Sequence, residues 1–154
     1  MAHVDVSRSA PVVERAEAVI GAPAGIVWDV LSEFSEWPSW NAGVTRMDFE
    51  GPLAVGTKFS WVGGGAKISS RLEEVVLGER LVWSGRTMGI RAIHVWSLED
   101  TGESTRVHTE ESFEGLLATI LRPLMRKTLA RALREGLESL KAEAESRAGA
   151  AATT

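Results

Sequence analysis

One histidine and one glutamate are spaced in this chain so that their side chains could exchange a proton. The segments Ile90–Glu99 and Ser104–Phe113 each alternate apolar and polar residues, which predicts two adjacent strands joined by a short glycine-containing turn. His94 falls on the more apolar face of the first strand, and Glu111 falls on that of the second. A turn of two or four residues keeps both faces on one side of the sheet, because side chains alternate with a period of two. His94 is then expected opposite Thr109 and diagonal to Glu111, within side-chain reach.

This pair has two interpretations. As a catalytic pair, the carboxylate would orient the imidazole and raise its pKa, leaving a general base or acid that faces the interior. As a structural pair, His94 and Glu111 would only satisfy each other's hydrogen bonds in mostly apolar surroundings. An odd number of residues in the turn would instead place His94 beside Glu110. The sequence leaves these alternatives open.

The aromatic residues indicate a lined space inside the fold. The chain has six Trp, four Phe and no Tyr. A buried indole needs a partner for its N–H, so this many tryptophans favour a cavity wall or several strand-to-helix contacts. The predicted ligand-binding residues, in addition to His94 and Glu111, are Trp40, Met47, Phe59, Trp61, Ser70, Trp83, Met88, Trp96, Leu121 and Met125. Glu74 is a further polar wall candidate, and Arg86–Gly89 is expected near the entrance. The same side chains could instead fill each other's space as an ordinary core.

A long amphipathic segment at the C-terminal end must cover this cavity. In Leu116–Ala148, apolar or small residues recur at offsets of three and four, which predicts a helix with one apolar side. Residues 121–141 hold six Lys/Arg and two Asp/Glu, a net charge of +4, whereas the rest of the chain sums to −8. The basic side could meet an anionic partner or could simply be solvated.

The remaining segments predict a meander of strands. Alternating patterns bounded by glycine-rich turns predict strands at Val12–Ile20, Val44–Glu50, Thr57–Val62, Ala66–Leu77, Arg80–Arg86, Ile90–Glu99 and Ser104–Phe113. Two short helices are expected between the first two strands, one starting at Pro23 and one around Ser35–Asn41. Short turns require antiparallel neighbours. The predicted fold is α+β, with a curved seven-stranded antiparallel sheet around the long C-terminal helix.

Several motifs resemble a known family. They are Ala22–Leu31 (APAGIVWDVL), Trp37–Asn41 (WPSWN), Gly51–Thr57 (GPLAVGT), and the hairpin His94–Leu98 with Ser104–Val107, Glu111 and Phe113–Gly115. Their order and spacing are similar to the polyketide cyclase/dehydrase branch of the START-like (SRPBCC) superfamily, over roughly residues 12–145. The resemblance implies a helix-grip fold with an internal cavity. It does not imply a substrate, because members range from aromatic-polyketide cyclases to lipid and hormone carriers and chaperone co-factors.

Composition excludes or disfavours several other functions. The chain has no cysteine, so thiolate catalysis and cysteine metal sites are excluded. Its net charge is −4, which disfavours nucleic acid as a partner. Gly63–Gly65 lacks the Lys-Ser/Thr of a phosphate-binding loop. The histidines His3, His94 and His108 have no metal-ligand spacing, and we expect no metal and no cofactor. With no signal peptide and no apolar membrane span, we expect a cytoplasmic protein without membrane insertion.

The predicted organisation is a flexible leader at residues 1–10, a single START-like domain at 11–147 and a disordered, low-complexity tail at 148–154. The leading functional hypothesis is the binding of a hydrophobic small molecule, aromatic or lipid-like, by a monomer or homodimer. The alternative is a cyclase or dehydratase in which His94 and Glu111 move protons. A third hypothesis is an interaction protein that uses the outer sheet face or the basic helix side.

Overall fold

Seven antiparallel strands form one sheet, in the order β1-β7-β6-β5-β4-β3-β2, in the computed structural model, which describes residues 3–153. The strands are β1 (Val12–Ile20), β2 (Val44–Asp48), β3 (Lys58–Gly63), β4 (Ala66–Val76), β5 (Arg80–Thr87), β6 (Ile90–Asp100) and β7 (Thr105–Glu114). Strands β2 to β7 follow one another as a meander, and β1 pairs with β7 at the far edge. The predicted strands are confirmed to within a few residues at their ends.

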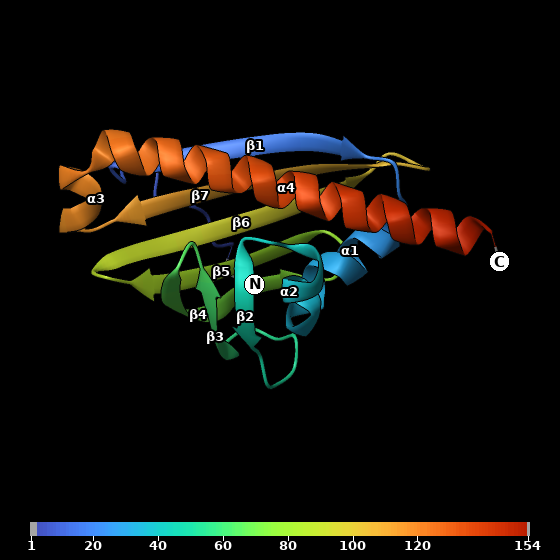
Figure 1. Cartoon of the computed structure of the whole chain (residues 1–154), viewed down its shortest axis with the longest axis horizontal. Coiled ribbons are helices and arrows are strands. Elements are labelled where there is room, and N and C mark those ends of the chain that lie inside the picture. The colour runs from blue at the N-terminus through green and yellow to red at the C-terminus, as the bar shows by residue number, and fades with distance from the viewer. Residues whose placement is uncertain (1–2, 154) are drawn as a thin grey trace.

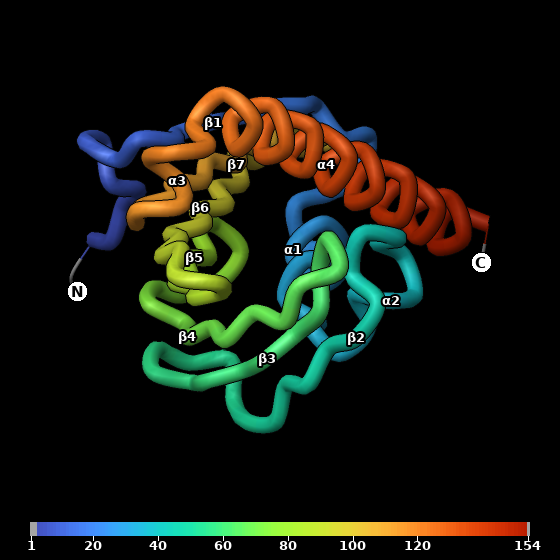
Figure 2. Tube along the Cα trace, turned by 60° about the vertical axis from the view of Figure 1, so that its left-hand side comes forward, coloured from blue at the N-terminus to red at the C-terminus, as the bar shows by residue number. Residues whose placement is uncertain are grey.

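The helices lie where the sequence pattern expects them. Between β1 and β2 come α1 (Ala24–Ser32), the single turn η1 (Phe34–Glu36) and α2 (Trp37–Trp40), and after β7 come α3 (Leu116–Ile120) and α4 (Arg122–Ala152). Figure 1 shows α4 running lengthwise across the sheet, beside β1 and β7. Figure 2 shows β2 to β5 curving away below that helix, with α1 and α2 at the open side. This arrangement confirms the helix-grip fold.

The first helix begins after a proline. Pro23 is the N-cap of α1 with φ −59°, and its carbonyl accepts the first helical hydrogen bonds from Ile26 and Val27. The buried side of α1 carries Val27, Trp28, Val30 and Leu31. Trp28 is therefore a core residue.

The long C-terminal segment is divided by a proline. We expect one helix over Leu116–Ala148, but α3 ends at Ile120 and α4 starts at Arg122. Pro123 has no N–H, and its ring collides with the carbonyl of the residue four positions earlier in a continuous helix, so the chain bends at Leu121. At the other end α4 continues to Ala152, through most of the segment expected as a tail; Thr154 lies outside the described residues.

The N-terminal segment lies on the outer face of the sheet. Val6 is buried in a small cluster with Val82 and Val95. The Val4 N–H donates to Glu74 at 2.9 Å, and the Arg8 guanidinium donates to the buried Glu110. The structure thus differs from the loose leader expected at residues 1–10, of which residues 1–2 lie outside the described part of the chain. The difference arises because apolar outer-face positions of β5 and β6 need a cover.

After β7, the chain turns from the sheet into α3 at Gly115, which packs against Gly89. Gly115, which precedes α3, has φ 118°, a conformation that residues with a Cβ rarely adopt. A Cβ at Gly115 would lie 2.3 Å from the carbonyl oxygen of Gly89, in the β5–β6 turn. This close approach sets the β5–β6 turn directly against the start of α3.

Candidate functional site

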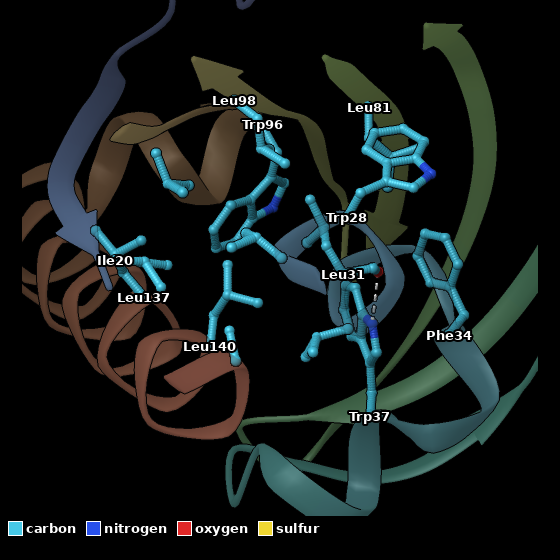
Figure 3. Packing of buried hydrophobic residues seen from close by; sticks show 14 of the residues in the cluster. Ile20, Trp28, Leu31, Phe34, Trp37, Leu81, Trp96, Leu98, Leu137 and Leu140 are labelled. Carbon is cyan, nitrogen blue, oxygen red and sulfur yellow. Dashed lines mark hydrogen bonds between the residues drawn. The ribbon is translucent and has the colours of Figure 1, made fainter. Parts of the chain in front are cut away.

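A cavity of about 740 Å³ lies between the concave face of the sheet and α4. Most of its wall is apolar or aromatic. The sheet contributes, among others, Trp61, Ile68, Ser70, Trp83, Ala92, His94, Trp96, Glu111 and Phe113, and the α1–α2 region contributes Leu31, Trp37 and Trp40. The lining residues of α4 are Thr128, Leu129, Arg131, Ala132, Leu133, Glu135, Gly136, Glu138, Ser139 and Ala142. Figure 3 shows part of the adjoining core, in which Trp96 lies between the leucines of α4 and Trp28 of α1.

The structure brings a subset of the predicted ligand-binding residues together around this cavity. Those in the wall are Trp40, Trp61, Ser70, Trp83, His94, Trp96 and Glu111. Those outside it are Met47, Phe59, Met88, Leu121 and Met125.

Two of the outlying residues belong to the solid core at the β2 end of the sheet. Phe59 is 5% exposed, and its ring centroid lies 4.9 Å from that of Phe34. Met47 packs against the same core cluster and lies opposite Trp61 in the β2–β3 pairing. The aromatic rings here fill each other's space, which is the alternative that the sequence left open.

The other three outlying residues lie toward the α3 end of the molecule. Met125 packs in a separate cluster with Val12 and Leu129, and Leu121 lies at the bend between α3 and α4. Met88 is 69% exposed in the β5–β6 turn. Large apolar residues of the bend are therefore not the part of the helical segment that lines the cavity.

Small residues of α4 line the cavity instead, and the sequence reasoning missed them. Leu129, Leu133, Leu137 and Leu140 are buried toward β1 and α1, and the residue just before each leucine, namely Thr128, Ala132, Gly136 and Ser139, lies in the cavity wall. Leu129 and Leu133 reach the cavity wall as well. The sequence carries a signal for the small residues, because small and large residues form two adjacent stripes on the helix and not one uniform apolar side.

The cavity opens between α4 and the facing loops. Among its lining residues, the exposed ones include Ala132 and Glu138 of α4, Ala42 and Gly43 before β2, and Gly64 in the β3–β4 turn. Figure 2 shows the α2–β2 segment directly below α4. The entrance therefore differs from the one expected at residues 86–89, of which only Thr87 lines the cavity.

The β6–β7 hairpin places His94 directly opposite Glu111. The predicted partner, Thr109, lies two pairs further along and faces Trp96, because the connection has four residues: Asp100 pairs with Thr105. The inward faces are as expected, since four is an even number. His94 Nδ1 lies 3.4 Å from Glu111 Oε2, and His94 Nε2 lies 2.8 Å from Thr109 Oγ1, at hydrogen-bonding distance.

Burial controls the charge of this pair. The side chains of His94 and Glu111 are 12% and 16% exposed, and the rings of Trp83 and Trp96 lie 4.7 and 5.3 Å from the imidazole centroid. Desolvation raises the pKa of Glu111 from 4.5 to about 8 and lowers the pKa of His94 from 6.5 to about 3. The direction for His94 is opposite to the one expected from a neighbouring carboxylate. At neutral pH, a carboxylic acid therefore faces a neutral imidazole.

This geometry restricts what each group can do. Both ring nitrogens of His94 face protein atoms, one toward Thr109 and one toward Glu111. The imidazole is thus placed to orient the acid, and the protonated Glu111 carboxyl is the group able to donate a proton or a hydrogen bond to a molecule in the cavity.

Two indole groups in the cavity wall have no hydrogen-bond acceptor. Trp37 Nε1 donates to the Leu31 carbonyl at 2.9 Å (Figure 3), and Trp61 Nε1 donates to Ser70 at 3.1 Å. In contrast, Nε1 of Trp40 and Nε1 of Trp96 are buried, and neither has a partner among residues 3–153. Unsatisfied buried donors are unusual in folded proteins.

Glu74, the further polar candidate, lies outside the cavity. The pairing of β4 with β5 shifts between Leu72 and Glu74, which indicates a β-bulge at this point. The extra residue reverses the alternation, so Glu74 faces outward and accepts a hydrogen bond from Arg80 Nε at 3.2 Å. Within residues 3–153 there is no group of three His, Asp or Glu side chains that could hold a metal ion.

Known proteins of one family share the fold described above. A curved antiparallel sheet closed over a long C-terminal helix defines a helix-grip protein of the START-like class. The family model for polyketide cyclase/dehydrase and lipid transport matches residues 3–145, so the chain belongs to this family. The family predicted from the sequence motifs is confirmed. A search of curated proteins finds no match to the chain.

Solved structures share the fold at low sequence identity. A hypothetical protein from Helicobacter pylori has a TM-score of 0.81 at 18% identity, covering 94% of this chain and 98% of that one. The Zhui aromatase/cyclase from Streptomyces sp. R1128 has a TM-score of 0.77 at 13% identity, covering 88% and 94%. A START superfamily protein from Mycobacterium smegmatis has a TM-score of 0.66 at 15% identity, covering 89% and 97%. No helix within residues 3–153 is both long and apolar enough to cross a membrane.

Proposed function

We propose that this protein binds a hydrophobic small molecule, aromatic or lipid-like, in the cavity between the sheet and α4. The observation that carries the proposal is a space of about 740 Å³ with a wall of tryptophan, aliphatic and small side chains. Pockets of this size and character are typical of small-molecule sites. The family, which is described by cyclisation, dehydration and lipid transport, supports the same conclusion.

The polar groups of the wall favour a ligand that carries an oxygen acceptor. Glu111 lies in the cavity wall and is held as a neutral acid, so its O–H can be donated to a molecule in the cavity. A carbonyl or phenol oxygen there would accept this hydrogen bond, whereas a pure hydrocarbon would leave the donor unsatisfied. Ligands with such an oxygen should therefore bind more tightly than hydrocarbons of the same shape.

Titration with the fluorescent probe N-phenyl-1-naphthylamine tests whether the cavity binds an apolar molecule. We expect probe fluorescence to rise on binding to the wild-type protein. Gly136→Phe should abolish the rise in fluorescence. Gly136 lines the cavity and a Cβ there meets nothing within 4 Å, so the phenylalanine ring would occupy the space that the probe needs. The matched control is Gly149→Phe on the exposed end of the same helix, which should bind like the wild type. Equal binding by the two variants would contradict the proposal.

Competition between fluorene and 9-fluorenone tests the oxygen acceptor, because the two molecules share one shape. We expect fluorenone to displace the probe at about 2–10-fold lower concentration, the usual worth of one net hydrogen bond. Glu111→Leu removes the carboxyl group, so it should erase this preference without weakening the binding of fluorene. Glu103→Leu, at an exposed position, is the control and should keep the preference. A preference unchanged in Glu111→Leu would show that Glu111 does not contact the oxygen.

A second candidate function is a cyclase or dehydratase acting on an aromatic-polyketide-like substrate. It is favoured by the protonated Glu111 beside His94 in the cavity wall. In a dehydration, Glu111 would give its proton to the departing hydroxyl, which leaves as water, and the resulting carboxylate would take the α-proton of the ketone. His94→Ala and Glu111→Gln should each abolish conversion of a β-hydroxyketone to its enone while probe binding persists. Loss of binding and turnover together would contradict the acid–base assignment.

A further inference from the structure

Four large apolar side chains are exposed together at the end of the molecule where α3 meets α4. Leu116, Ile120, Leu124 and Met88 are 75%, 65%, 58% and 69% exposed. Figure 1 shows α3 and the β5–β6 turn at this same end, and the contact between Gly115 and Gly89 joins them. Exposed apolar residues are ordinary when they are scattered, but a cluster of them indicates a contact surface. We call these four residues the end patch.

The end patch is next to a strongly basic stretch. Residues 115–134 contain five basic residues and no Asp or Glu; the basic residues are Arg122, Arg126, Lys127, Arg131 and Arg134, all exposed. The ion pairs within α4 lie in its second half, where Lys141 meets Glu145 and Arg147 meets Glu143. The cations near the end patch are therefore available to a partner, although the protein as a whole carries −4.

The exposed apolar residues, together with cations that form no ion pair within residues 3–153, select the kind of partner. A second copy of this chain docked through the same surface would place cations against cations, which is unfavourable. An anionic lipid bilayer suits both features, because its interface accepts apolar side chains and its headgroups attract Lys and Arg. The bend at Leu121 and Pro123 turns α3 away from the axis of α4, so apolar groups of both helices reach one end of the molecule.

We propose that the α3–α4 bend docks this protein on the surface of an anionic lipid bilayer, with the end patch in the interfacial layer and the basic stretch against the headgroups. None of the four end-patch residues lines the cavity, and of the five basic residues only Arg131 does, so the surface can be tested at residues outside the cavity wall. The proposal assigns a role to the basic helix side that the function of the cavity leaves unexplained.

Vesicle co-sedimentation of the full chain tests the proposal. We expect binding to vesicles of phosphatidylcholine mixed with phosphatidylglycerol, at least tenfold weaker binding to phosphatidylcholine alone, and loss of binding at high salt. Both Leu116→Ser/Ile120→Ser/Leu124→Ser and Arg122→Glu/Lys127→Glu should reduce binding at least tenfold. These positions are exposed, so the variants should fold, which circular dichroism and probe binding in the cavity would verify.

Matched controls separate the end patch from general effects. Leu77→Ser removes a leucine that is 74% exposed in the β4–β5 turn, and Lys58→Glu/Lys67→Glu reverses two exposed charges on β3 and β4. Both should bind vesicles like the wild type. Equal binding to neutral and anionic vesicles would overturn the proposal, as would unchanged binding by the end-patch variants. A dimer that the triple serine variant dissociates would also overturn it, by assigning the end patch to a second copy.

Discussion

A single carboxyl group illustrates how burial, and not the neighbouring residue, decides charge in this protein. Glu111 faces His94 at 3.4 Å, which in water would favour an ion pair. Both side chains are nearly enclosed by the cavity wall, and the desolvation of each charged form dominates, so both groups are neutral at pH 7. A neutral acid can donate to an uncharged ligand, which suits an apolar cavity.

The stability of the protein should therefore fall with rising pH above neutrality. Between pH 4.5 and 6.5, the folded and unfolded forms of the pair each bind one proton, so the pair adds no slope. From pH 6.5 to about 8, the folded state retains the Glu111 proton while the unfolded state has none, so the free energy of unfolding decreases by about 1–2 kcal/mol. Urea unfolding of the wild type and Glu111→Gln across this range would measure it.

In Glu111→Gln this decrease should be absent, because the amide does not titrate. The exposed Glu103→Gln is the control and should retain the wild-type slope. Equal slopes for the wild type and Glu111→Gln would mean that Glu111 is ionised in the folded protein at neutral pH.

Much of this pair could be predicted from the sequence, and the limits have physical reasons. The alternation of apolar and polar residues is enough to place His94 and Glu111 on one face, because that face must be buried. Their direct pairing depends on whether the turn has two or four residues, and both lengths keep the same faces. The protonation states depend on desolvation in three dimensions, which no local pattern records.

At the scale of elements, α4 acts as a cover because its two adjacent stripes differ in size. The leucine stripe anchors the helix on β1 and α1, and the adjacent stripe of small residues leaves room for the cavity, whose wall on this side also includes Leu129 and Leu133. Gly136 lies in the middle of this helix, where glycine is less favourable than alanine. A glycine that is unfavourable for helix stability at this position is consistent with a need to keep the cavity open.

Gly136→Ala should increase stability without blocking the cavity. A Cβ at Gly136 meets no atom within 4 Å, so the substitution removes backbone entropy from the unfolded chain at no steric cost. We expect a gain of about 0.5–1 kcal/mol in the free energy of unfolding. Urea unfolding would measure it, and probe titration should show wild-type affinity. A destabilised variant would mean that the helix needs glycine there for close packing.

Strand β4 shows why element-level prediction fails at single positions. Its apolar residues alternate correctly as far as Leu72, and simple continuation would direct Glu74 into the cavity. The bulge between Leu72 and Glu74 reverses the faces. No glycine or proline marks the bulge in the sequence, so the pattern gives no sign of it. Outward placement leaves Glu74 with Arg80 and the N-terminal segment as partners.

For the molecule as a whole, the N-terminal segment determines how the convex side of the sheet is closed. Val6 is 5% exposed against Val82 and Val95, and no sequence pattern predicts this contact, because residues 1–10 lack a periodic pattern. Val6→Ala should lower the free energy of unfolding by about 1–2 kcal/mol. Val55→Ala, at a side chain that is 53% exposed, is the control and should change it by less than about 0.5 kcal/mol. Equal effects would indicate that the segment is detached in solution.

The global fold was the most predictable level, because seven alternating segments and one long amphipathic segment admit few antiparallel arrangements. The cavity was less predictable. Aromatic residues of the strands either pack against other rings, as Phe59 does against Phe34, or line the cavity, as Trp96 does. The choice depends on how far the sheet curves away from α4, which only the assembled molecule determines.

The meeting of Gly115 with Gly89 has a consequence for how this architecture could change over time. A carbonyl oxygen lies where any Cβ at Gly115 would have to be, so even a methyl group there would push α3 off the β5–β6 turn. The absence of a side chain at Gly115 therefore determines the direction in which α4 crosses the sheet, although Gly115 lies some distance from the cavity that α4 covers. A substitution at Gly115 during evolution would change the direction of α4 over the sheet. The ligand preference of the cavity would then shift without any change in the residues that contact the ligand.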